Sequence, residues 1–181
     1  MSKRKIGGFK DIKPQWLNCP TVTQTGADTT TSLEVQLPIA RIASTTSATV
    51  IEILRVYAAL TGLPTIASVT EAVDSQTLTI STSSGGTVDL AFNDGRVLCV
   101  FSRQQRGAFT AGGTYSRTNN EIMEFNLTDN NGNGVLVASD SIFLQLSSVT
   151  TGNANIAQVK VLYRFKSVGY LEYIGIAQSQ Q

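Results

Sequence analysis

The chain has 181 residues, 14 Lys and Arg, 13 Asp and Glu and a formal charge of +1, with 41% hydrophobic and 15% charged residues. This predicts one globular domain, and no apolar run reaches the roughly 18 to 20 residues that a membrane-spanning helix needs. Because the sequence has no histidine, Ser-His-Asp and Cys-His catalytic groups and His-ligated zinc are excluded, and we expect neither catalysis nor a metal or cofactor.

The first thirteen residues are strongly basic. Five of the cations and one acid lie there, which leaves nine cations and twelve acids, a formal charge of −3, for the rest of the chain. Residues 1–31 lack apolar periodicity and are predicted to form a flexible N-terminal arm, and residues 32–181 the folded domain. The cations of such an arm would neutralise nucleic-acid phosphates, or serve as a nuclear address or a solubilising terminus. They are Lys3, Arg4, Lys5, Lys10 and Lys13.

Short runs typical of β-strands follow the arm. Residues 33–39 alternate apolar and polar side chains, and Pro38 places this strand at a sheet edge or a bend. Residues 66–74 form the one short helix that the spacing predicts. Gly, Asn and Asp turns separate the runs. We therefore predict an all-β fold, an antiparallel β-sandwich that is a single jelly roll of about eight strands. The further predicted strands are 47–60, 76–82, 87–92, 96–101, 121–127, 134–138, 141–149, 158–168 and 171–176.

Residues 102–120 are predicted to form a long polar loop. Its arginines are interleaved with Phe109 and Tyr115, a combination that suits phosphates and unpaired bases. The same residue types are enriched at subunit contacts, and we favour that interpretation.

Two groups of acidic and amide side chains have a chemical and a plainer interpretation. Asp129, Asn131, Asn133 and Asp140 match much of the spacing of a calcium-binding EF-hand loop, but strands rather than helices are expected on either side. A turn joining two strands is therefore favoured. Glu121 and Glu124 are the pair that a glycosidase would need, and surface charge is favoured there too.

Two segments carry a family resemblance. VIEILRVYAAL, residues 50–60, and QVKVLYRFKSVGYLEYIGIAQSQQ, residues 158–181, resemble capsid proteins of small circular single-stranded DNA viruses of eukaryotes. The resemblance implies a single jelly roll that assembles with copies of itself into a small icosahedral shell, with the arm directed inward to a genome of single-stranded DNA, or alternatively RNA. It also implies location in the virion. The basic start lacks the apolar region of a signal peptide, which predicts synthesis in the host cytoplasm, and import into the nucleus is the alternative role of its cations.

The basic arm departs from this family, in which arms are often longer and denser in arginine. Arg103 and Arg106 are therefore candidates to share nucleic-acid binding with the arm. The alternative function is that of a carbohydrate-binding or adhesive β-sandwich module. It leaves the arm without a role, and the sequence shows no clustered Trp and Tyr platform for sugars.

Overall fold

Eleven strands and one helix make up the part of the chain that the computed structural model describes, which is residues 13–38, 46–61, 72–86, 90–110, 113–115, 122–149 and 154–180. The elements are β1 (Gln15–Asn18), β2 (Val22–Thr23), β3 (Thr31–Gln36), β4 (Ser47–Thr61), β5 (Ala72–Ser81), β6 (Val97–Thr110), β7 (Gly113–Tyr115), β8 (Ile122–Asn126), β9 (Val135–Val137), β10 (Ser141–Val149), β11 (Ile156–Gly169) and α1 (Tyr170–Ser179).

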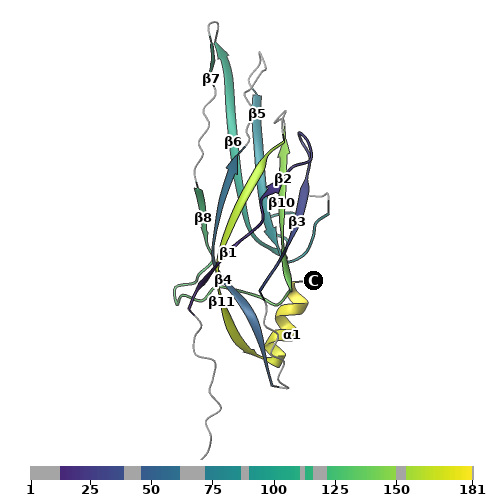
Figure 1. The fold of residues 1–181 in the computed structure, drawn as a ribbon, viewed down its shortest axis with the longest axis vertical. Coiled ribbons are helices and arrows are strands. Elements are labelled where there is room, and N and C mark those ends of the chain that lie inside the picture. The colour runs from purple at the N-terminus through teal and green to yellow at the C-terminus, as the bar shows by residue number, and fades with distance from the viewer. Residues whose placement is uncertain are drawn as a thin grey trace, which may run out of the picture.

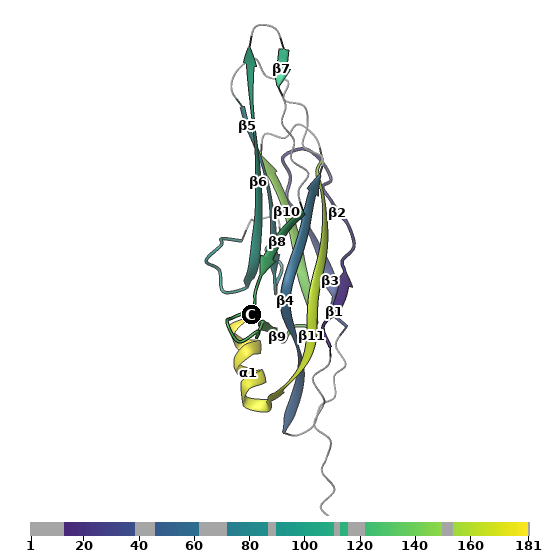
Figure 2. The same cartoon turned by 90° about the vertical axis from the view of Figure 1, so that its left-hand side faces the viewer.

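The strands form two antiparallel sheets that face one another (Figure 1). Sheet A has the order β1–β11–β4–β8, with β2 also on β11 and β9 also on β4. Sheet B has the order β3–β10–β5–β6–β7. Figure 2 shows the two layers edge-on in an elongated molecule, with α1 and β7 toward opposite ends.

The pairing is that of one long hairpin rolled up on itself. β1 and β2 pair with β11, β3 with β10, β4 with β8 and β9, and β5 with β6. Rolling the hairpin brings β4 onto β11 and β5 onto β10. This strand order is a jelly roll, so the predicted all-β sandwich is confirmed.

The core fills the space between the sheets. Alternate residues of each strand point inward, and those from sheet A include Ile51, Ile53, Val56 and Val161. Sheet B supplies a facing set that is entirely buried or nearly so: Val35, Leu78, Ile80, Cys99, Phe101, Ile142, Leu144 and Leu146. Two buried apolar layers facing each other fix the register of every strand, because a slip by one residue would turn each side chain to the opposite face.

Most of the predicted strands are confirmed. The runs at 47–60, 76–82, 96–101, 121–127, 134–138, 141–149 and 158–168 correspond to β4, β5, β6, β8, β9, β10 and β11. The edge position predicted from Pro38 is also confirmed, because β3 is the edge strand of sheet B. Within the described residues, the first strand of the sheets starts at Gln15, and β1 and β2 both pair with β11. The division between arm and domain at residue 31 stays a prediction.

Three predictions in the middle of the chain are wrong where the structure describes it. Residues 90–92 lie in the connection between β5 and β6 rather than in a strand, and 87–89 are outside the described residues. Residues 102–110 continue β6 instead of forming a loop, because β5 pairs with β6 as far as Gly107. Residues 72–74 begin β5 rather than end a helix, and 66–71 are outside the described residues.

The run at 171–176 is helical, so the strand predicted there is also wrong. One face of α1 carries Tyr173 and, three and four residues later, Ile176 and Ala177. These side chains pack against Val50 and other apolar side chains at the ends of β4, β9 and β11. A strand would turn these three residues to both faces. In the described ranges no helix, α1 included, is long and apolar enough to cross a membrane.

Gly134 lies directly against the backbone of β4. A Cβ atom added there would lie 2.1 Å from the backbone oxygen of Ile53, a distance that no side-chain movement can relieve. Gly175 in α1 has nothing within 4 Å of the same position. The two glycines therefore make a matched pair for substitution.

We expect Gly134→Ala to lower the free energy of unfolding by about 3 kcal/mol, because the backbone of β4 must move to admit the methyl group. Gly175→Ala should raise it by about 0.5 to 1 kcal/mol, since alanine favours the helix. Urea unfolding of both variants measures the difference. Equal stability of Gly134→Ala and the parent chain would contradict the close packing at β4.

Candidate interaction surface

The outer face of sheet A carries a cluster of aromatic and charged side chains. In antiparallel sheets, residues directly opposite one another share a face. Tyr57 of β4 is opposite Glu124 of β8 on one side and Lys160 of β11 on the other. Trp16 of β1 is opposite Leu162 of β11. Four strands that are far apart in the sequence thus bring these side chains together on one face.

Trp16 and Tyr57 form an aromatic pair on this face. Their ring centroids are 5.4 Å apart with planes inclined by 58°, and Trp16 remains 48% exposed. The ammonium group of Lys160 lies 4.6 Å from the centroid of the Trp16 ring. A cation over an exposed ring contributes about 0.5 to 1 kcal/mol. The expectation that the chain has no clustered Trp and Tyr platform is therefore wrong, because the sheet register unites residues 41 positions apart.

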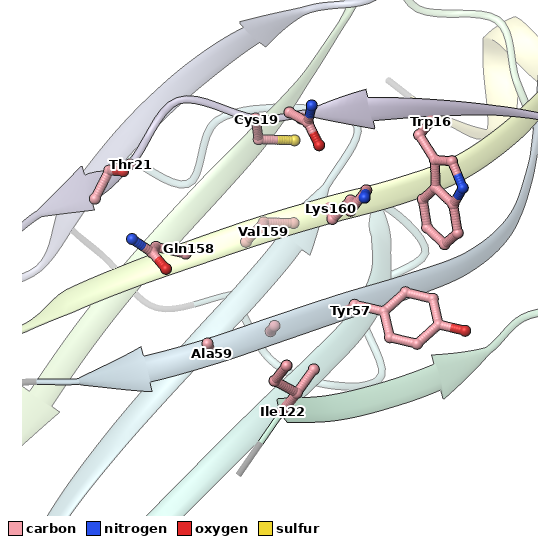
Figure 3. Close-up of a pocket in the computed structure, with 11 residues that line it drawn as sticks. Trp16, Cys19, Thr21, Tyr57, Ala59, Ile122, Gln158, Val159 and Lys160 are labelled. Atoms are coloured by element: carbon pink, nitrogen blue, oxygen red, sulfur yellow. The ribbon is translucent and has the colours of Figure 1, made fainter. Parts of the chain in front are cut away.

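The aromatic pair borders an open hollow of about 630 Å³ (Figure 3). Tyr57 and Ala59 line it from β4, Ile122 from β8, and Gln158 and Lys160 from β11. The thiol of Cys19 lies at its edge, packed partly against the core. Burial raises the pKa of this thiol to about 12, so it stays protonated at neutral pH and is a poor nucleophile. The hollow is thus suited to binding rather than to covalent chemistry.

Glu52 holds a second part of this face together. Its side chain is fully buried, and its carboxylate accepts hydrogen bonds from Arg164, from Lys166 at 3.0 Å and from the backbone N–H of Gly134 at 3.0 Å. Burial raises the pKa of the carboxyl, but the hydrogen bonds outweigh it and leave the pKa below the ordinary value of 4.5. The ionised carboxylate therefore joins β4, β11 and the residue just before β9.

The outer face of sheet A is rich in cations. The strands of this sheet carry six charged side chains among the described residues, and the register places all of them on the outer side. Four are cations and two are acids: Arg55, Lys160, Arg164 and Lys166, with Glu52 and Glu124. Both acids are already paired, Glu124 with Arg55 at 3.0 Å. A surface with two more cations than acids attracts anionic rather than cationic partners.

The predicted nucleic-acid residues that the structure describes do not line the hollow. Lys3, Arg4, Lys5 and Lys10 are outside the described residues, and Lys13 is exposed just before β1. Arg103 of β6 donates a hydrogen bond of 2.6 Å to the backbone oxygen of Leu60. Arg106 lies further along β6, opposite Val73 of β5. Their role in binding nucleic acid stays a prediction.

The Asn-rich segment after β8 is the predicted turn between two strands. One carboxylate oxygen of Asp129 accepts hydrogen bonds of 2.8 Å from the backbone N–H groups of Asn131 and Asn133, and those from Asn133 contribute most to lowering the Asp129 pKa. Gly132 takes a φ of 76°, which glycine adopts without strain. Asp140 follows β9 at the start of β10. Of the predicted carboxylate pair, Glu124 is bound to Arg55, and Glu121 is outside the described residues.

No family model and no curated protein matches the chain. Solved structures similar to it include VP1 of the Trichodysplasia spinulosa-associated polyomavirus in complex with GM1 oligosaccharide, at 11% identity over 91% of this chain and 96% of that one, with a TM-score of 0.49. VP1 of Merkel cell polyomavirus in complex with GD1a oligosaccharide is 12% identical over 90% of this chain and 97% of that one, with a TM-score of 0.45. Sequence identities and TM-scores this low do not transfer a function, so the function of this chain rests on its own strands and side chains.

We expect Glu52→Gln to lower the free energy of unfolding at pH 7 by about 1 to 3 kcal/mol, because two cations and one N–H group lose a charged acceptor. Since the folded-state pKa lies below the unfolded value, the contribution of Glu52 is complete above about pH 4.5 and is lost as the pH falls through the folded pKa. Denaturant unfolding at pH 7 and pH 3 measures both effects.

Glu124→Gln is the matched control for this prediction. Its partner Arg55 and Glu124 itself have side chains 44% and 43% exposed, and an exposed ion pair contributes about 0 to 1 kcal/mol. If the two variants lost equal stability at pH 7, the buried network around Glu52 would not have the role given to it here.

Proposed function

We propose that the chain is a structural capsid protein that assembles with copies of itself into an icosahedral shell around a nucleic-acid genome. The observation that carries the proposal is the strand order: a single jelly roll that directly follows a basic N-terminal segment. Jelly rolls build viral capsids as well as lectin domains. A cationic segment leading into the fold favours the first of these, because its cations would neutralise the phosphates of an enclosed genome.

Exposed apolar side chains support self-association. Among the described residues, four large ones away from the hollow are more than half exposed: Phe92 at 73%, Val149 at 61%, Tyr170 at 53% and Leu171 at 83%. They lie on β10, α1 and the connection between β5 and β6. Apolar surface on several sides of one molecule is what neighbouring subunits in a shell would cover.

The genome would be held chiefly by the arm, directed inward. One arm with five cations and one acid binds a polyanion weakly, but many arms facing one enclosed polymer gain affinity through multivalency. Arg103 and Arg106 are proposed to share this role. The comparisons give no support to the assignment to single-stranded DNA viruses, which rests on the resemblance of residues 50–60 and 158–181. The proposed location is the virion, after synthesis in the host cytoplasm and nuclear import.

A second candidate function is carbohydrate binding by an adhesive β-sandwich. The aromatic pair of Trp16 and Tyr57 beside an open hollow favours it, because exposed aromatic rings stack on the apolar faces of sugars. It leaves the basic arm without a partner. An isolated monomer that binds oligosaccharides and ignores nucleic acid would select this function.

The test compares the full chain with a variant that lacks residues 1–13. We expect the full chain to form closed particles that contain nucleic acid, visible by electron microscopy and by the ratio of absorbance at 260 and 280 nm. The shortened chain should form particles that are nearly empty, because the folded domain supplies the contacts between subunits and the arm supplies the cations. Particle loading should fall steeply as salt rises during assembly.

Two outcomes would contradict the proposal. If neither protein forms particles at any salt concentration, the chain is not a self-assembling shell protein. If both form particles with equal nucleic-acid content, the arm does not hold the genome. Phe92→Ser provides a control for assembly through apolar surface, since this side chain is 73% exposed and its loss should not unfold the domain.

A further inference from the structure

We propose that the hollow on the outer face of sheet A is a binding site for single-stranded nucleic acid, in which an unpaired base stacks on Trp16 and Tyr57 while Lys160 contacts the adjacent phosphate. The inference rests on the proposed function, and it gives the packaged polymer a second contact that the arm alone does not supply. It also identifies the outer face of sheet A as the face that meets the genome.

The aromatic pair supplies the stacking surface. Trp16 is 48% exposed although it belongs to a strand, and its ring and that of Tyr57 border the same hollow (Figure 3). At about 630 Å³ the hollow is within the size range of sites for small molecules, and a single base fits inside it. Every base has a face that can stack on an aromatic ring, but only when it is unpaired. Duplex DNA would not enter.

Charge distinguishes a nucleic acid from a neutral partner. The described strands of sheet A carry four cations and two acids on this face, whereas the chain after residue 13 has a formal charge of −3. Next to the aromatic pair, Arg55 and Glu124 neutralise one another, and Lys160 gives the hollow a positive charge although acids predominate in the chain after residue 13. Lys160 already lies over Trp16, and a phosphate next to a stacked base would be within the reach of its flexible side chain.

Trp16, which lines the hollow, also comes directly after the basic segment in the sequence. Lys13 is exposed and precedes Trp16 by three residues. A nucleic acid held by the arm of the same molecule would therefore be at high effective concentration near the hollow, and weak stacking of its bases would suffice to bind it there. A glycan would gain nothing from this neighbour.

Trp16 is the only tryptophan in the chain, so its fluorescence reports on the hollow itself. The experiment titrates the full chain at low salt with a short oligothymidylate and with an abasic oligonucleotide that has the same number of phosphates. We expect oligothymidylate to quench the fluorescence and the abasic strand to bind the arm without quenching. An increase in salt should weaken both.

Variants measured by anisotropy of a labelled oligothymidylate separate stacking from charge. Trp16→Ala should weaken binding about tenfold, as expected for the loss of one stacked base. Trp16→Phe keeps an aromatic ring and should retain most of the affinity, which would show that the loss in Trp16→Ala does not come from unfolding. Lys160→Gln should reduce the slope of affinity against salt by about one phosphate contact. Phe92→Ala, which removes an exposed ring elsewhere, is the matched control and should bind like the parent chain.

Equal quenching by the abasic strand, or equal affinity of Trp16→Ala and the parent chain, would overturn the inference. Quenching by an oligosaccharide but not by oligothymidylate would overturn it in favour of glycan binding. The inference and the proposed function fail separately. Particles of Trp16→Ala with a full nucleic-acid content would refute the site alone, whereas quenching without any particles would refute the shell alone.

Discussion

The pairing of β4 with β11 is the constraint on which the rest of the structure depends. It runs from Ser47 opposite Gly169 to Thr61 opposite Ile156, and every other strand of sheet A attaches to one of these two. Their inner sides supply a large part of the core, and α1 packs at one end of the ladder. Because both strands alternate strictly on either side of one irregularity, the same ladder also determines which residues meet on the outer face.

That irregularity is a bulge in β4. Tyr163 is opposite Ile53 and Leu162 is opposite Arg55, so Leu54 has no partner on β11. Without the extra residue, strict alternation from the buried Ile53 would turn Arg55 into the core and Val56 out of it. The bulge restores the alternation one position later. Arg55 thereby reaches Glu124, Val56 becomes fully buried, and Tyr57 comes to the outer face beside Trp16.

Alternation and turn chemistry explain why much of the fold could be predicted from the sequence. Residues 158–168 alternate apolar and polar side chains, and the apolar run at 141–149 is bounded by turn residues, so both strands were located almost to the residue. The predictions that failed depend on neighbours instead. The polar part of β6 is a strand because β5 pairs with it, and residues 171–176 are helical because Tyr173 and Ile176 find an apolar surface on Val50 and Ala138. The candidate hollow required the register of four strands, which no single segment encodes.

The outer faces of the two sheets differ in what covers them, and this difference favours a functional role for sheet A. On sheet B, the amide of Gln145 donates to the backbone of Gly86 and accepts from Leu90, so the connection between β5 and β6 lies over the strand. On sheet A, the segment before β9 reaches Glu52 and α1 packs on Val50 and Val168, so both cover only one end of the face. The row that contains Tyr57 and Lys160 stays open to solvent. Chain segments thus cover part of each outer face, whereas the aromatic and cationic surface around Tyr57 and Lys160 is open to a partner.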